Sequence, residues 1–205
     1  MKYATIVADP PWEMPSGGTY AGSSRWKNNP RRPSALPYET MDLHEIRALP
    51  VGDLAETNAH LYLWVPNTHL EASYGIVRDW GFRPSQVLVW AKPPRGIGLG
   101  GAFTNTVEFV LFARRGSLSP QTRSDTSWWQ WRRPHNAHSS KPDGFLDVVE
   151  QVSPGPYVEL FARRARFGWD YWGDQSLGTA EMTAADEKPW TDLEERLDNL
   201  LAEPS

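Results

Sequence analysis

The sequence predicts an α/β fold in which a mostly parallel sheet is covered by helices on both faces. Three observations support this class. Short runs of β-branched and aromatic residues alternate along the chain with segments of helical periodicity. The apolar runs lack polar and apolar alternation, which indicates strands buried on both faces. The length of 205 residues suits one domain with a sizeable core.

The first predicted strand covers residues 3 to 8 and ends at Asp9-Pro10-Pro11-Trp12. Because prolines prevent both a longer strand and an immediate helix, Asp9 is expected at the carboxyl end of the strand. That end faces the ligand crevice in an open α/β sheet. A carboxylate, the Pro10 carbonyl and the flat face of Trp12 would suit a planar ring with an exocyclic amine, such as adenine or cytosine. Alternatively, Asp9 begins a turn and Trp12 packs in the core.

The next elements follow from capping signals and apolar periodicity. Asp42 and Glu45 form a capping-box pair, which predicts a helix from Asp42 to about Pro50. Further elements are expected as strand 61–65, helix 68–80, strands 86–91 and 107–113, a helix that begins at 143, and strand 157–162. Strands 86–91 and 107–113 are expected to be joined without a crossover helix.

Two segments without periodicity are predicted to be loops beside the active site. Residues 13–37 are rich in glycine and proline, and Trp26 stands among Arg25, Lys27, Arg31 and Arg32. This pattern suits phosphate contact with base stacking, although a solvated surface loop fits equally well. The segment 114–142 carries three tryptophans, which either fold back on the core or meet a base or a partner: Trp128, Trp129 and Trp131.

The charge is distributed unevenly along the chain. The net charge is −4, but residues 181–205 contain eight acidic and two basic residues, a net of −6, which leaves +2 for residues 1–180. Local basic patches contact phosphate regardless of the bulk charge. A second basic cluster is interrupted by one acid and consists of Arg114, Arg115, Arg123, Arg132, Arg133 and Lys141.

Composition excludes several classes of protein. The chain has no cysteine, so a disulfide framework and a thiolate zinc site are excluded, and its five histidines show no metal-ligand spacing. No apolar run reaches the length of a membrane helix, and Met1 leads directly into the first strand without a signal peptide. We therefore expect a soluble intracellular protein.

The sequence Asp9-Pro10-Pro11-Trp12 is the signature of amino-group methyltransferases acting on adenine, and the chain resembles the MT-A70 family of that class. Further blocks resemble the family in its usual order. They begin at Leu36-Pro37-Tyr38, Leu61-Tyr62-Leu63-Trp64, Val89-Trp90-Ala91-Lys92, Thr106-Val107-Glu108, His138-Ser139-Ser140-Lys141, Tyr157-Val158-Glu159 and Trp172-Gly173-Asp174-Gln175. The resemblance covers about residues 3 to 176.

The resemblance implies a Rossmann-like class I methyltransferase fold that is circularly permuted, with the cofactor strand after the catalytic one. It implies that S-adenosyl-L-methionine is the cofactor and that Asp9, Pro10, Pro11 and Trp12 form the catalytic pocket. The implied cofactor-binding residues are Lys141, Glu159, Arg163, Asp174 and Gln175, and relatives usually have asparagine in place of Asp174. Without the resemblance, Glu159, Arg163 and Gln175 could be ordinary surface or salt-bridged residues. A structural or cofactor-adjacent role is expected for His138, and no metal is expected.

The implied activity is transfer of a methyl group to the N6 amine of adenine. DNA is the expected acceptor, because the chain resembles the bacterial and phage branch of the family, which places it in the cytoplasm of a bacterial or phage-infected cell. RNA, a free nucleotide, or a non-catalytic role in nucleic-acid binding are the alternatives. Nucleic acid is expected to contact loops 21–33 and 114–141.

The expected organisation is a methyltransferase domain at 1–178 and an acidic linker with a helix at 179–205. That terminal helix carries Leu193, Leu197, Leu200 and Leu201 at helical spacing. It either docks on its own domain or recruits a partner, and a homodimer is one possibility.

Overall fold

A computed structural model describes residues 1–13, 40–94, 102–132 and 140–172. Within these residues, seven strands form one sheet with the order β5-β3-β4-β2-β1-β6-β7. The strands are β1 (Tyr3–Ala8), β2 (Ala55–Val65), β3 (Arg83–Ala91), β4 (Val107–Arg115), β5 (Trp128–Gln130), β6 (Tyr157–Leu160) and β7 (Trp169–Trp172). The helices are α2 (Leu43–Ala48), α3 (Val51–Leu54), α4 (Leu70–Asp79) and α5 (Gly144–Val152), with a 3-10 turn at Asn67–His69 before α4.

The sheet is mixed but mostly parallel. β1 lies between β2 and β6 and runs parallel to both, and β6 runs parallel to β7. Only β4 runs in the opposite direction to the other described strands, since it is antiparallel to both β2 and β3. β3 and β4 are antiparallel neighbours, an arrangement that needs no crossover helix and agrees with the expected direct connection. The α/β class predicted from the sequence is also confirmed.

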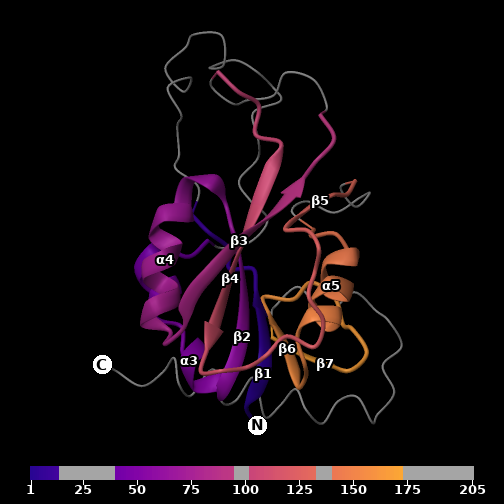
Figure 1. Ribbon diagram of the computed structural model, residues 1–205. Helices are drawn as coiled ribbons and strands as arrows, with labels where there is room; N and C mark the ends of the chain where they lie inside the picture. The colour runs from indigo at the N-terminus through magenta and orange to yellow at the C-terminus, as the bar shows by residue number, and fades with distance from the viewer. Residues whose placement is uncertain (14–39, 95–101, 133–139, 173–205) are drawn as a thin grey trace.

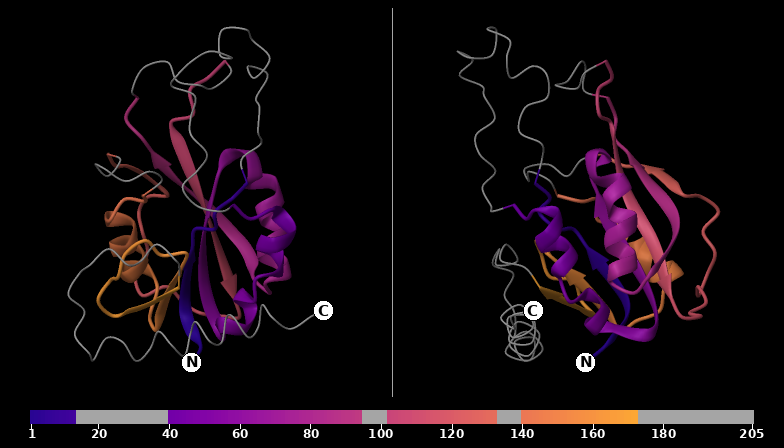
Figure 2. Two further views of the ribbon diagram at one scale, coloured as in Figure 1. Left: turned by 180° about the vertical axis from the view of Figure 1, so that it is seen from behind. Right: turned by 90° about the vertical axis from the view of Figure 1, so that its left-hand side faces the viewer.

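Helices cover both faces of the sheet (Figure 1). On one face, Ile46 of α2 and Ile76 of α4 pack with Ile6 and Leu63 in a large apolar cluster. The right-hand view of Figure 2 shows α4 lying across this face. On the other face, Phe145 of α5 packs in a second cluster. Strand residues alternate between these clusters, as the two-residue period of a β-strand requires.

Local signals predicted the helix ends well. The Asp42 carboxylate accepts from the backbone N–H groups of His44 and Glu45, and the Glu45 side chain accepts from the N–H of Asp42, so the capping box is complete. Gly81 follows α4 with a φ of 81°, a left-handed conformation that glycine adopts without a steric cost.

One predicted loop contains a strand. Residues 128–130 of the segment 114–142 pair in parallel with β3 and form the edge strand β5. Such a short strand at an edge carries too little periodicity to be read from sequence. No helix among the described residues is long and apolar enough to cross a membrane. Most of loop 13–37 and the whole tail 179–205 lie outside the described residues.

Candidate active site

The candidate active site lies where β1, β2 and β6 end. In the sheet register, Ala8 is paired with Leu63 of β2 and with Leu160 of β6. The next residue on each strand is Asp9, Trp64 or Phe161, and all three line one cavity of about 290 Å³. Parallel pairing of the strands therefore brings residues from three separate segments of the sequence to one side of the cavity. This side lies at the carboxyl ends of the strands, where α/β proteins bind ligands.

Four side chains of alternating charge run along this edge. The Lys141 ammonium lies 2.9 Å from Oδ1 of Asp9 and 3.3 Å from Oε2 of Glu108. The other carboxylate oxygen of Glu108 accepts from Lys92 at 2.6 Å. Both ammonium groups also lie over indole rings. Lys141 is 5.1 Å from the ring centre of Trp64, and Lys92 is 5.0 Å from that of Trp90. Each charge is thus balanced by a neighbour, which a low-dielectric site requires.

Burial and pairing act against each other on these groups. Burial raises the pKa of Asp9, although the Lys141 ammonium opposes this effect. Burial would also raise the pKa of Glu108, but Lys141 and Lys92 together lower it. The pKa of Lys141 is raised, because the attraction of both carboxylates outweighs the effect of burial. Lys141 is therefore charged at neutral pH and holds Asp9 and Glu108 together.

Glu159 and Arg163 also line the cavity. Burial, and then the nearby Asp9 carboxylate, raise the pKa of Glu159 to about 7. Within the described chain, no hydrogen bond or ion pair to the Glu159 carboxylate is recorded. A partly buried carboxylate without a donor is costly, and hydroxyl groups of a ligand would relieve that cost.

A backbone strain lies beside these residues. Phe161 has a φ of 65°, in the left-handed region that large side chains rarely adopt. Its ring packs on Trp172 with the ring centres 4.9 Å apart, and the next residue, Ala162, donates its N–H to the Trp172 carbonyl. The chain thus turns sharply after β6, and both Phe161 and Arg163 line the cavity. Such strain is typical of sites where geometry is constrained by function.

Trp12 does not line this cavity in the described structure. Its side chain is 5% exposed and belongs to the core on the α4 face. The indole N–H donates to the Trp64 carbonyl at 2.9 Å. Trp12 therefore packs in the core, as the alternative interpretation of the sequence expected, and its contact with a base stays a prediction.

The proline carbonyls are also less free than the sequence suggested. The Pro10 carbonyl accepts from the N–H of Trp12 at 2.8 Å, and the Pro11 carbonyl accepts from Met41 at the same distance. A carbonyl oxygen has two lone pairs, so the Pro10 carbonyl retains capacity for one further donor. These bonds explain why the motif needs its residue order: the two prolines turn the chain, and Met41 and Trp12 fix it to the core.

The second basic cluster is divided by the fold. Arg114 and Arg115 lie at the end of β4, whereas Glu108 near its start belongs to the candidate site. Six and seven residue steps of a strand span about 20 and 24 Å, so these two arginines lie at the opposite end of the strands from Glu108. Their guanidinium groups donate to the carbonyls of Leu118 and Gly52. This corrects the expectation that they belong to an active-site loop.

Other expected residues lie outside the described part of the chain. These are Asp174, Gln175, His138, Arg133 and the basic residues around Trp26. Conversely, sequence reasoning missed three residues that the fold brings to the site: Lys92, Glu108 and Trp64. A signal for two of them was present, since Lys92 follows one apolar strand and Glu108 interrupts the start of another. Among the described residues, no group of three potential ligands could hold a metal ion.

Comparison with known proteins identifies the family of the chain. The MT-A70 family profile matches residues 3–175. The type II methyltransferase M.MunI of Mycoplasma sp is 30% identical over 183 residues, which are 84% of this chain and 77% of that protein. The N(6)-adenosine-methyltransferase MT-A70-like protein of Drosophila melanogaster is 28% identical over 79% of this chain and 24% of its own length. The human catalytic subunit METTL3 is 26% identical over 79% of this chain and 26% of its own length. The family signature and the assembled site lead to one conclusion: the chain belongs to the MT-A70 family of adenine N6-methyltransferases.

Proposed function

We propose that this protein transfers a methyl group from S-adenosyl-L-methionine to the N6 amine of adenine in DNA. The observation that carries the proposal is the buried Asp9 carboxylate at the end of β1, in one cavity with Lys141 and Glu159. The family acts on adenine amines, and the resemblance to its bacterial and phage branch supports DNA as the acceptor. The chain covers 77% of the bacterial relative and about a quarter of the insect and human ones.

Asp9 is assigned to the acceptor amine. The amine of adenine delocalises its lone pair into the ring and is a weak nucleophile. A hydrogen bond from the amine to the Asp9 carboxylate, with a second to the remaining lone pair of the Pro10 carbonyl, would direct that lone pair toward the methyl group. Because the amine gains positive charge as it is methylated, a nearby carboxylate stabilises the transition state more than the ground state.

The ion pair between Lys141 and Asp9 must open when the acceptor amine binds to Asp9. In the absence of a ligand it is shared between Asp9 and Glu108, at 2.9 and 3.3 Å. Glu108 can retain the ammonium while the amine of adenine takes its place on Asp9. The pairing therefore keeps a buried carboxylate balanced until the acceptor arrives, and Glu108 positions Lys141 without contacting the methyl group.

The lining of the cavity supports S-adenosyl-L-methionine as the cofactor. S-adenosyl-L-methionine supplies an activated methyl group on a sulfonium centre, so positioning dominates the catalytic contribution of the protein. Glu159, a buried acceptor without a recorded donor, suits the ribose hydroxyls, and Arg163 suits the adenine side of the cofactor. We assign Asp174 and Gln175 to the same ligand on the basis of the family resemblance.

We further infer that the fold is a circularly permuted Rossmann-like methyltransferase. The proposed cofactor strand β6 is adjacent to the catalytic strand β1 in the sheet and parallel to it, yet it follows β1 in the chain by about 150 residues. An adenine inside a duplex cannot reach such a pocket, so the target base must be flipped out or presented unpaired.

The test is mass spectrometry of nucleosides from DNA and RNA incubated with the protein and cofactor labelled in its methyl group. Asp9→Ala and the exposed Asp79→Ala are the variant and its matched control. We expect labelled N6-methyladenine in DNA, lost in Asp9→Ala and retained in Asp79→Ala. Label in RNA alone would contradict the choice of acceptor. Equal activity of Asp9→Ala and the native protein would contradict the assignment of Asp9.

A further inference from the structure

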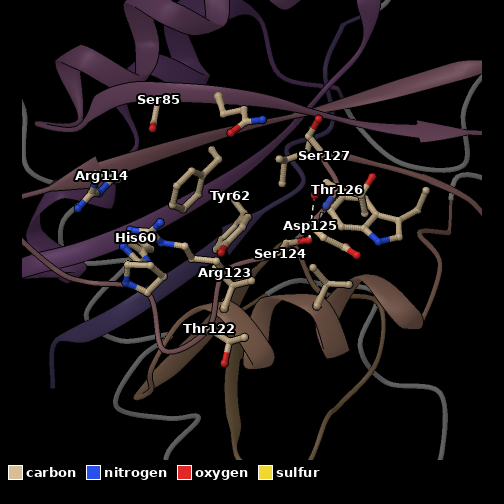
Figure 3. Close-up of a pocket in the computed structure, with 17 residues that line it drawn as sticks. His60, Tyr62, Ser85, Arg114, Thr122, Arg123, Ser124, Asp125, Thr126 and Ser127 are labelled. Carbon is tan, nitrogen blue, oxygen red and sulfur yellow. Dashed lines mark hydrogen bonds between the residues drawn. The ribbon is translucent and has the colours of Figure 1, made fainter.

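A second and larger cavity lies on the α5 face of the sheet, outside the site described above. Its volume is about 390 Å³, which is within the range of small-molecule sites. Strands β2, β3 and β4 form its floor, Val148 and Val152 of α5 form one wall, and residues 120–127 form the other. Figure 3 shows His60 and Arg114 at one end and Ser124 to Ser127 at the other, with Tyr62 between them.

One end of this cavity is cationic. Arg114 lines it and donates through one terminal nitrogen to the Leu118 carbonyl at 3.0 Å. Its Nε is buried and has no hydrogen-bond partner within the described chain. Since Arg114 lines the cavity, its guanidinium group places a positive charge there that an anionic ligand would neutralise. Arg123 lines the same cavity and adds a second positive charge.

Aromatic rings line the middle of the cavity. Trp129 stacks on Trp131 with ring centres 5.4 Å apart and planes inclined by 6°, so one face of the Trp129 indole is covered. Trp129 also lines the cavity, and a flat ligand that stacks on it would use the indole face that Trp131 leaves uncovered. Tyr62 and Phe112, in contact at 4.9 Å between ring centres, line the floor.

The remaining lining offers hydrogen-bonding groups. The side chains of Ser85, Gln86 and Ser127 line the cavity and have no recorded hydrogen bond among the described residues. Asp125 adds an exposed carboxylate at the end opposite Arg114. Carboxylate, amide and hydroxyl groups are those that pair with the edge of a nucleobase.

We propose that this cavity binds a nucleotide unit, with its phosphate at Arg114 and its base against Trp129. The lining of the cavity combines guanidinium groups, an indole and polar side chains, which match a phosphate, a base plane and a base edge. The nucleotide unit belongs either to the substrate strand or to a free mononucleotide, because both carry the same three groups.

The position of the cavity relates it to the candidate active site. Phe145 of α5 lines the cavity of Asp9, and it packs edge-on against Tyr62, which lines the second cavity. The two cavities are thus neighbours on one face of the sheet, separated by aromatic side chains. A strand whose adenine enters the first cavity could therefore place another nucleotide in the second.

The test is isothermal titration calorimetry with the full chain carrying Asp9→Ala. This background weakens the acceptor pocket, so binding at the second cavity is measured independently of the proposed methyl transfer. The probes are the four nucleoside 5′-monophosphates, the corresponding nucleosides and single-stranded DNA pentamers. Arg114→Met removes the cation and Trp129→Leu the stacking surface. Ser85→Tyr fills the cavity without removing a side-chain hydrogen bond of the described structure. Arg83→Met is the control, because Arg83 pairs with Arg114 in the sheet but does not line the cavity.

We expect binding that Arg114→Met, Trp129→Leu and Ser85→Tyr each weaken by about tenfold or more, and Arg83→Met much less. Tighter binding of pentamers than of monophosphates would identify the substrate strand, and binding of monophosphates alone would identify a free nucleotide. Absence of binding by every probe would overturn the proposal. Equal weakening by Arg83→Met would also overturn it, since it would indicate attraction by surface charge alone.

Discussion

Replacement of Glu159 by glutamine tests the buried acid of the proposed cofactor site. Burial and the Asp9 carboxylate raise the pKa of Glu159 from 4.5 to about 7. The folded protein therefore keeps this proton up to neutral pH, whereas the unfolded chain releases it near pH 4.5. Between these values the unfolded state binds fewer protons. The contribution of Glu159 to the free energy of unfolding is consequently full below pH 4.5 and is lost as the pH rises through 7.

The magnitude follows from the same shift. Between pH 5.5 and pH 8, linkage gives a loss of about 2 kcal/mol in the free energy of unfolding from this one group. Glutamine has nearly the same shape but does not ionise, so Glu159→Gln should lack this part of the pH dependence. Relative to the native protein, the variant should therefore gain about 2 kcal/mol over this interval.

The assay is urea denaturation without cofactor, followed by circular dichroism at both pH values. The exposed Glu71→Gln is the matched control, and it should follow the native protein. The same pH dependence in Glu159→Gln and the native protein would refute the argument that Glu159 is buried as an acid. Cofactor titration of the same variant should show weaker binding. A gain in stability with unchanged cofactor affinity would remove Glu159 from the proposed binding site.

Two further substitutions test the rest of the site. Lys141→Met leaves Asp9 and Glu108 without their shared cation. The free energy of unfolding should therefore fall by about 3 kcal/mol at pH 8 and by less at pH 5, where the carboxylates can take up protons. An equal loss at both pH values in urea denaturation would contradict the pairing. Trp12→Phe removes the hydrogen bond to the Trp64 carbonyl and should lower the free energy of unfolding by about 1 to 2 kcal/mol in the same assay. Unchanged stability with a raised KM for the acceptor would instead indicate that Trp12 contacts the base.

The direction of the strands explains why several charged side chains lie close together in the proposed site. Asp9 follows a strand that ends at this edge, and Glu108 stands near the start of β4, which runs in the opposite direction. Carboxyl ends of parallel strands and the amino end of an antiparallel strand therefore meet. Lys141, just before α5, lies between the two acids. Two partly buried acids at one end of the strands are stabilised by such a cation, and their attraction raises the pKa of Lys141.

The sequence by itself determined the local structure and the family. The prolines after β1, the capping box of Asp42 and Glu45, and the glycine after α4 act within a few residues, so their effects were predictable. The apolar runs predicted the strands, and the ordered motifs predicted the MT-A70 family that the comparisons confirm.

Only the tertiary structure decided which side chains meet. The burial of Trp12, the pairing of Lys141 with both Asp9 and Glu108, and the distance of Arg114 from the site all depend on contacts between residues far apart in sequence. Strand order, direction and register decide these contacts, because a shift of one residue moves every side chain of a strand to the other face. The apolar pattern of a single sequence predicts where each strand lies in the chain, but it does not show which strands are neighbours in the sheet.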